Sequence, residues 1–315
     1  MKTALIMGIT GHFGKAVALE LQSRGWHLKA LLRPETSAKA EVCQSLSQEF
    51  PTLEIISGQA SQLEDVHRAA EQVELIVYGV NPPGYDWKNK ALPWLEQAAR
   101  VAEEKQLTLL FPGNVYVFNP EQGPCFDENA QIQPITSKGQ IRQQMEARLQ
   151  SAAEKGAQVI VIRAGNFIPA GKGFSWLQLL IKTSAKKRVL NFPGPEQTRQ
   201  AWAYLPDLAK VAAELVERAD ELKGYQVFHF EGHTLNFAEL SQSLQAITSQ
   251  PLVCKNFFWL PFQFLKPFSP LFQGVLEMRY LWQKEVLLDQ SKLLRFLGHQ
   301  PEQTPLQQIL SELLA

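Results

Sequence analysis

Short apolar runs alternate with segments whose apolar residues recur at helical spacing through the first half of the chain. Each run is six or seven residues long, which suits a strand better than a helix. Near-continuous apolar strands joined by helices are typical of a parallel sheet covered on both faces. The alternation predicts a doubly wound α/β fold with strands over residues 3–9, 27–33, 53–58, 75–80, 107–113 and 159–165, and with helices that include 14–25, 62–72 and 91–106.

Composition excludes several classes of protein. The 31 lysines and arginines balance 31 aspartates and glutamates. The chain therefore lacks the basic excess that would indicate a nucleic-acid partner. Cys43, Cys125 and Cys254 lie far apart and form no CxxC pair, which argues against a disulfide framework and structural zinc. The six histidines are scattered without metal-ligand spacing, so no metal site is expected.

The first residues, MKTALIMGITG, contain one lysine and a short apolar run that Gly8 ends, which predicts a strand rather than a secretion signal. No uninterrupted apolar run approaches the roughly 18 to 20 residues that a membrane-spanning helix needs. We therefore expect a soluble, cytoplasmic protein with no membrane span.

Composition changes after residue 165, where glycine, proline and aromatic residues become frequent, as in binding loops. Helices are predicted over 207–219, with Asp207 as the N-cap, and over 236–248, with Asn236 as the N-cap. In the aromatic segment 257–272, three prolines exclude a long helix. Core packing or a dimer contact is the first expectation there, and a lid over an apolar substrate or a membrane-touching patch are the alternatives.

The segment GITGHFG, residues 8–14, lies between the first strand and the first helix. Gly8, Gly11 and Gly14 permit a sharp turn and a close approach of the backbone to a pyrophosphate, beside the free N–H groups of a helix N-terminus. The loop therefore predicts a dinucleotide site, and a tight turn without a ligand is the alternative. Its other expected contacts come from Thr10, His12 and Phe13, with His12 contributing its backbone.

The end of the second strand indicates which dinucleotide is held. An acidic residue there would bind the ribose 2′-hydroxyl of NAD, whereas an arginine accommodates the 2′-phosphate of NADP. The chain has Arg33 and no carboxylate before Glu35. Because a guanidinium can donate two parallel hydrogen bonds to a phosphate, NADP(H) is favoured over NAD(H).

Further segments resemble a known family. GITGHFG resembles the glycine fingerprint of the short-chain dehydrogenase/reductase superfamily. FPGNVYVF, VIVIRAGNFIP, WAYLPDLAKVAAEL and LLDQSKLLRFLG resemble landmarks of its extended branch, the NAD-dependent epimerase/dehydratase family. The resemblance implies a Rossmann core over residues 1–165 and a mainly substrate-binding domain over 166–315, with segments around 204–230 returning to the core. It also implies hydride exchange with an alcohol or ketone such as a sugar nucleotide, and pairing as a homodimer.

The family carries a Tyr-x-x-x-Lys pair after strand five and a serine or threonine at the end of that strand. Aligned on Tyr116 and Glu146, this chain has Lys138 in the tyrosine position and Arg142 in the lysine position, with Pro112 near the hydroxyl position. The resemblance thus places both cations beside the cofactor, although a solvated helix face is the usual fate of such side chains.

The roles of these cations remain open in the sequence. Arg142 can bond ribose or phosphate, and its charge beside Lys138 would favour a neutral amine able to act as an acid or base. A charged Lys138 would instead stabilise an alkoxide or bind an anionic substrate. Asn114 and Tyr116 are the nearest alternative catalytic groups.

The resemblance adds cofactor contacts at Gln59, where the family often has an acidic residue, and at Gly79, Val80, Asn81, Gly165, Asn166 and Phe167. Tyr85 and Trp87 stand on a loop at the carboxyl edge of the sheet, where ligands of open α/β sheets bind. With Asn114, Asn166 and Tyr204, they are the candidate substrate contacts. The leading hypothesis is an NADP(H)-dependent oxidoreductase, epimerase or dehydratase with an altered catalytic pair, and the alternative is a catalytically silent NADP(H) sensor or regulatory protein.

Overall fold

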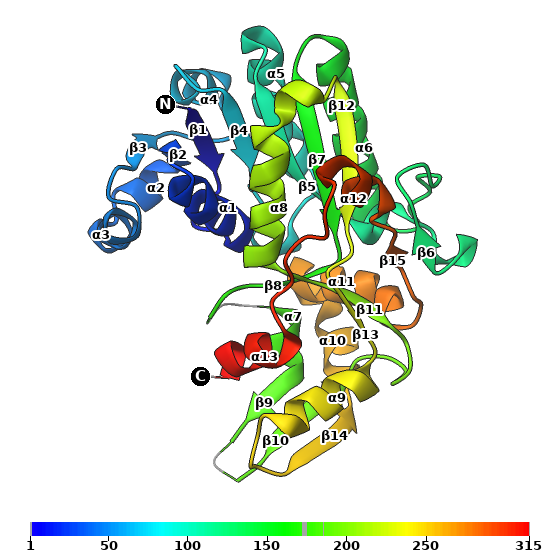
Figure 1. Cartoon of the computed structure of the whole chain (residues 1–315). Coiled ribbons are helices and arrows are strands. Elements are labelled where there is room, and N and C mark those ends of the chain that lie inside the picture. The colour runs from blue at the N-terminus through cyan, green and yellow to red at the C-terminus, as the bar shows by residue number, and fades with distance from the viewer. Residues whose placement is uncertain (1, 172–174, 185, 315) are drawn as a thin grey trace.

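A computed structural model describes residues 2–171, 175–184 and 186–314, except for the side chains of Ser37 and Tyr85. Seven parallel strands form its main sheet in the order β12-β7-β5-β4-β1-β2-β3 (Figure 1). The predicted doubly wound α/β fold and its six strands are confirmed, and β12 is an addition. The strands are β1 (Thr3–Met7), β2 (His27–Leu32), β3 (Glu54–Ser57), β4 (Leu75–Tyr78), β5 (Thr108–Asn114), β7 (Gln158–Ala164) and β12 (Tyr225–Phe230).

Helices cover both faces of this sheet because successive strand side chains point to opposite sides. In β1, Ala4 and Ile6 belong to one buried cluster, whereas Leu5 and Met7 belong to the other. The first cluster includes α1 (His12–Ser23), α3 (Ala40–Glu49), α8 (Leu205–Glu217) and α12 (Ser291–Leu297). The second includes α4 (Leu63–Ala69), α5 (Ala91–Lys105) and α6 (Ser137–Glu154).

Smaller sheets and helices build the rest of the molecule, most of which lies below the main sheet in Figure 1. Most of them enclose a third buried cluster in which Trp202 and Trp282 lie among other apolar side chains, whereas Phe126 and Leu288 belong to a fourth. The sheets are β14-β10-β9, β13-β11-β8 and β15-β6. Their strands are β6 (Cys125–Phe126), β8 (Asn166–Ile168), β9 (Ile181–Thr183), β10 (Arg188–Phe192), β11 (Gln200–Tyr204), β13 (His233–Leu235), β14 (Leu252–Asn256) and β15 (Leu287–Leu288). The α-helices are α7 (Trp176–Leu180), α9 (Phe237–Ala246), α10 (Leu260–Leu265), α11 (Pro270–Glu277) and α13 (Leu306–Leu314).

The two predicted helix caps have different outcomes. Asn236 caps α9 in a reciprocal capping box with Glu239, as expected. Asp207 is not the cap of α8, because the helix begins two residues earlier, with Pro206 in its first turn. The buried carboxylate of Asp207 instead accepts hydrogen bonds from the backbone and the hydroxyl of Thr304, both at 2.7 Å.

The aromatic segment 257–272 divides between the interior and the surface. Prolines confine it to the short helices α10 and α11, joined by a 3-10 turn over Lys266–Phe268, as predicted. Trp259 is buried, whereas Phe264 and Phe268 are exposed. Core packing therefore holds for only part of the segment. No helix within the described ranges combines the length and apolar character needed to cross a membrane.

Candidate functional site

The glycine loop joins β1 to α1 by a close backbone approach to the end of β4. Gly8 has φ +94°, and a Cβ added to it would lie 2.6 Å from the carbonyl oxygen of Gly79. A Cβ on Gly14 would lie 2.4 Å from the carbonyl oxygen of Gly8. These two glycines are therefore required by the fold itself.

Gly11 differs from the other two glycines of the loop. Its φ is −90°, which any residue can adopt, and an added Cβ would lie 3.3 Å from the carbonyl oxygen of Gly8, a tight contact but not the collision found at Gly8 and Gly14. The residue is exposed at the N-terminus of α1, where the first N–H groups of a helix have no intrahelical partner. The exposed position of Gly11 at this helix end therefore suits an anion from outside the fold.

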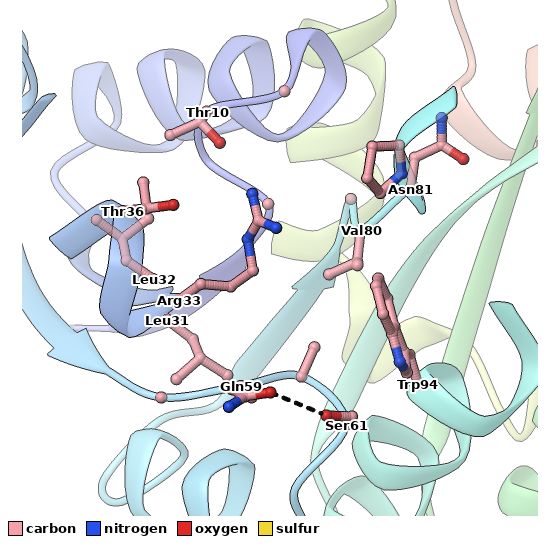
Figure 2. Close-up of a pocket in the computed structure, with 16 residues that line it drawn as sticks. Thr10, Leu31, Leu32, Arg33, Thr36, Gln59, Ser61, Val80, Asn81 and Trp94 are labelled. Atoms are coloured by element: carbon pink, nitrogen blue, oxygen red, sulfur yellow. Dashed lines mark hydrogen bonds between the residues drawn. The ribbon is translucent and has the colours of Figure 1, made fainter. Parts of the chain in front are cut away.

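A cavity of about 250 Å³ opens beside this loop at the carboxyl edge of the sheet (Figure 2). It follows the ends of four neighbouring strands, as expected for a ligand site in an open α/β sheet. Among its described lining residues there is no aspartate or glutamate. They are Gly8, Thr10, Gly11, Leu31, Leu32, Arg33, Thr36, Gly58, Gln59, Ala60, Ser61, Gly79, Val80, Asn81, Pro83 and Trp94.

Arg33 follows β2 and precedes the short helix α2 (Pro34–Ser37). Its guanidinium projects into the cavity between the loop of Thr10 and the end of β4 at Val80 (Figure 2). It forms an ion pair with Glu35 at 3.4 Å, but both side chains are more than half exposed. Such a surface pair is weak, so the guanidinium can exchange Glu35 for a ligand anion at little cost. Thr36, which the sequence reasoning missed, adds a hydroxyl to the same wall.

Gln59 lines the opposite wall and is held from behind by Asp65. The Asp65 carboxylate accepts from the backbone N–H of Gln59 at 2.8 Å, and Ser61 donates to the Gln59 side chain at 3.5 Å. Trp94 on α5 also lines the cavity (Figure 2). The sequence predicted the helix but gave Trp94 no role, and only the packing of α5 beside β4 reveals it as a lining residue.

Lys138 lies in the first turn of α6 and is buried, with 9% of its side chain exposed. Its ammonium lies 3.3 Å from a carboxylate oxygen of Glu277 on α11. The other oxygen of Glu277 accepts from the backbone N–H of Lys138 at 3.0 Å. Glu277 therefore balances the side-chain charge and satisfies one free N–H of the helix. The alternative of a solvated face for Lys138 is excluded.

Arg142 lies one turn further along α6, with its guanidinium 4.7 Å from the centre of the Trp87 ring and 5.1 Å from that of Phe111. It donates to the carbonyl oxygen of Pro112 at 3.1 Å, whereas its Nε is buried without a partner in the described structure. Burial lowers the pKa of Arg142 below its ordinary value. Pro112 fits in β5 because pairing with β4 ends two residues earlier, so no ladder N–H is lost there.

Trp87 connects the predicted substrate loop with both cations. Its ring stacks on Tyr116 at 6.2 Å and lies 6.0 Å from the Lys138 ammonium. Its indole N–H donates to the side chain of Asn81 at 2.8 Å. Asn81, Trp87, Tyr116 and Lys138 thus form one cluster with Arg142. The side chain of Tyr85 lies outside the described residues.

Asn114 ends β5 and shapes the turn that carries Tyr116. Its side chain accepts from the Tyr116 backbone N–H at 3.1 Å, and its own carbonyl accepts from Arg163 at 2.6 Å. Arg163 also holds Glu146 in a bidentate pair at 2.9 and 2.7 Å. These buried bonds fix α6, and with it Lys138 and Arg142, against the end of β5.

The remaining predicted residues serve packing as well. The rings of Phe13 and Phe167 stack at 6.2 Å, which joins α1 to β8 next to Asn166. A Cβ on Gly165 would lie 2.2 Å from the carbonyl oxygen of Ala201, so this glycine is needed for strand packing. His12 is exposed at the start of α1.

The structure places Tyr204 apart from the cluster of cations. Its ring belongs to the buried cluster of the C-terminal part, and its hydroxyl donates to Glu312 on α13 at 2.6 Å. A sequence pattern cannot reveal that engagement, because Glu312 is more than a hundred residues away. No group of three or more His, Cys, Asp or Glu side chains in the described ranges could hold a metal ion.

Comparison with known proteins bears on this arrangement. Residues 1–249 match the family model described as the RmlD substrate binding domain. The fold is similar to UDP-glucose 4-epimerase from Bifidobacterium longum in complex with NAD+ and UDP, with a TM-score of 0.74, 13% identity, and coverage of 99% of this chain and 97% of that one. A comparison with curated protein sequences gives no significant match.

Two further solved structures share the fold. The dTDP-glucose 4,6-dehydratase from Bacillus anthracis in complex with NAD has a TM-score of 0.72 and 16% identity over 99% of this chain and 95% of that one. A monomeric L-threonine 3-dehydrogenase of metagenomic origin has a TM-score of 0.73 and 16% identity over 98% of this chain and 96% of that one. An epimerase, a dehydratase and a dehydrogenase thus share this fold, so the fold does not decide among their reactions.

Proposed function

The chain belongs to the RmlD substrate binding domain family, within the extended short-chain dehydrogenase/reductase superfamily. On this premise we propose that it is a nicotinamide-dependent enzyme that acts on an alcohol or ketone. Sugar nucleotides are the first class of substrate to consider. The observation that carries the proposal is the continuity of the site. The glycine loop, the cavity of Arg33 and the cluster of Lys138 follow the carboxyl ends of adjoining strands.

The glycine loop fits a pyrophosphate. A Cβ at Gly8 or Gly14 would collide with backbone, whereas Gly11 is exposed at the N-terminus of α1. Free N–H groups and the helix dipole favour negative charge at this position. The adenosine half of a dinucleotide would then lie in the cavity between Arg33 and Trp94, where a planar base can contact the indole.

NADP(H) is the favoured form of the cofactor. Arg33 and Thr36 offer a guanidinium and a hydroxyl to a 2′-phosphate, and no carboxylate among the described lining residues would repel it. The related folds that contain NAD are only 13% and 16% identical to this chain, so their cofactor does not decide the preference here.

The altered pair would divide the work between its two cations. Nicotinamide, when bound, supplies or accepts the hydride. Lys138 would stabilise the negative charge that develops on the substrate oxygen, because its ammonium is held in a buried place by Glu277. Arg142 would hold the cofactor from its position between Trp87 and Phe111. Trp87 would present its ring to the substrate, and Asn114 and Tyr116 would shape the end of that pocket.

A silent NADP(H) sensor is the second candidate. It is favoured by one observation: the family's tyrosine and hydroxyl positions hold Lys138 and Pro112, neither of which carries a hydroxyl. Both candidates bind the dinucleotide, but only the enzyme turns over a substrate.

Two measurements test the proposal. In the first, NADPH and NADH are titrated while nicotinamide fluorescence is followed, with Arg33→Ala as the variant and Arg100→Ala as the control. Arg100 is matched because it is similarly exposed and also carries a single-carboxylate ion pair, with Glu104. NADPH should bind more tightly, and only Arg33→Ala should lose roughly tenfold in NADPH affinity, the loss expected for an exposed charge-assisted bond.

In the second measurement, turnover is followed at the nicotinamide absorbance with sugar nucleotides, aldehydes and ketones. Hydride transfer whose rate falls in the Lys138→Met variant supports the enzyme hypothesis. Tight NADPH binding without turnover of any compound favours the sensor hypothesis. An absence of dinucleotide binding would refute both.

A further inference from the structure

Large apolar side chains are exposed along the segment from Phe258 to Leu271, which we call the aromatic ridge. Phe268 is 84% exposed, Phe264 69% and Phe258 68%, and Leu260, Leu265 and Leu271 are also exposed. Elsewhere in the described ranges only Leu19 and Ile135 are large apolar residues exposed to a comparable degree. Most of the exposed large apolar side chains therefore gather within fourteen residues, which marks a binding surface.

The ridge has a fixed inner side. Trp259 is buried and donates from its indole N–H to the carbonyl oxygen of Pro193 at 3.0 Å. Phe262 packs against Trp259 and Phe272 with ring centres at 5.9 and 5.3 Å. Because these inward rings fix α10, the outward side chains cannot turn into the core.

Exposed lysines lie in the ridge and along the sheet β14-β10-β9 that leads into it, although the whole chain is neutral. Residues 176–195 and 251–276 together contain four lysines and an arginine besides Lys266, and neither stretch contains an aspartate or glutamate. The sheet β14-β10-β9 holds the two stretches side by side (Figure 1). The exposed cations of the described residues there are Lys182, Lys186, Lys187, Lys255 and Lys266.

We propose that the aromatic ridge and its lysines bind the protein to the surface of an anionic phospholipid bilayer. Exposed aromatic side chains flanked by lysines can enter the headgroup region while the ammonium groups meet lipid phosphates. Adhesion to a surface requires no spanning helix. A twofold contact with a second copy is disfavoured, because the patch would then meet its own lysines. This proposal is independent of the reaction at the dinucleotide site.

Co-sedimentation of the full-length protein with vesicles tests this inference. We expect binding to phosphatidylcholine vesicles that contain phosphatidylglycerol, little binding to phosphatidylcholine alone, and a decrease in binding as salt is raised. The double variant Phe264→Ser/Phe268→Ser should lose at least roughly tenfold in affinity for the vesicles. This loss is expected because the aromatic area that would be buried in the bilayer is removed. Ile135→Ser is the control, because Ile135 is an exposed apolar residue outside the ridge.

The contribution of charge is tested separately. The double variant Lys255→Gln/Lys266→Gln should weaken binding to anionic vesicles, whereas Lys155→Gln, a change of the exposed lysine that caps the C-terminus of α6, should not. Thermal unfolding of each variant verifies the fold.

Several outcomes would overturn the inference. They are equal binding to both kinds of vesicle, no binding to either, and undiminished binding of the phenylalanine variant. If the protein does not bind vesicles but self-associates, and the phenylalanine variant abolishes this self-association, the ridge is a contact between copies of the chain instead.

Discussion

Replacing Glu146 by glutamine should test how the cation pair is held in place. Glu146 is buried on α6 and accepts two hydrogen bonds from Arg163 on β7. Arg163 is itself buried and also donates to the carbonyl oxygen of Asn114. The substitution keeps the size of the side chain but removes its charge.

The expected magnitude follows from this geometry. A glutamine can still accept one bond from Arg163, but its NH2 group would face a guanidinium N–H, and the arginine charge would remain buried without a counter-charge. Loss of one partner from a buried ion pair costs about 3 to 5 kcal/mol of unfolding free energy. Because one hydrogen bond survives, we expect a loss of about 3 kcal/mol, at the lower end of that range.

Urea unfolding, followed by tryptophan fluorescence and by far-ultraviolet circular dichroism, measures the effect. Glu154→Gln is the matched control, because Glu154 is an exposed glutamate on the same helix and should change the unfolding free energy by less than about 0.5 kcal/mol. The double variant Glu146→Met/Arg163→Met should recover part of the loss, since an apolar pair leaves no charge unmatched.

A Glu146→Gln variant as stable as Glu154→Gln would refute the reasoning. A double variant whose loss equals or exceeds the sum of its two single losses would also contradict it. Either result would mean that the pair does not fasten α6 to the sheet.

Three further predictions concern the site and its surroundings. Gly11→Val should abolish NADPH binding in titrations yet keep the circular dichroism of the parent, because φ at Gly11 suits any residue, whereas Gly14→Ala should impair folding through its collision with Gly8. With a substrate in hand, Lys138→Met should lower kcat and leave NADPH affinity nearly unchanged, whereas Arg142→Ala should weaken NADPH binding, and the reverse pattern would exchange their roles. Burial and the charge of Arg163 lower the pKa of His229 from 6.5 to about 3, so the unfolded chain binds the proton first as pH falls. The contribution of neutral His229 to the unfolding free energy is complete above about pH 6.5 and declines toward pH 3 by up to about 1.4 kcal/mol per pH unit. Urea unfolding at several pH values should show a shallower decline of the unfolding free energy for His229→Gln.

The sequence by itself determined the features that depend on neighbours in the chain. Apolar runs of strand length between helical segments specified the doubly wound sheet. The side chains of a strand alternate between the two faces of a sheet, whereas helical spacing gathers apolar side chains in one stripe of the helix. The glycine loop and Arg33 were placed by the same logic, since residues that follow parallel strands must meet at one edge. Asn236 was assigned as a cap because its capping box spans only four residues.

Only the tertiary structure decided the features that join distant segments. Glu277 is 139 residues from Lys138, so no spacing rule could pair the two or reveal that the lysine is buried. Trp94 and Thr36 became lining residues through packing across the cavity. In the aromatic ridge, the interior admits Trp259 and leaves Phe268 outside, a choice that composition cannot make because both side chains are equally suited to burial.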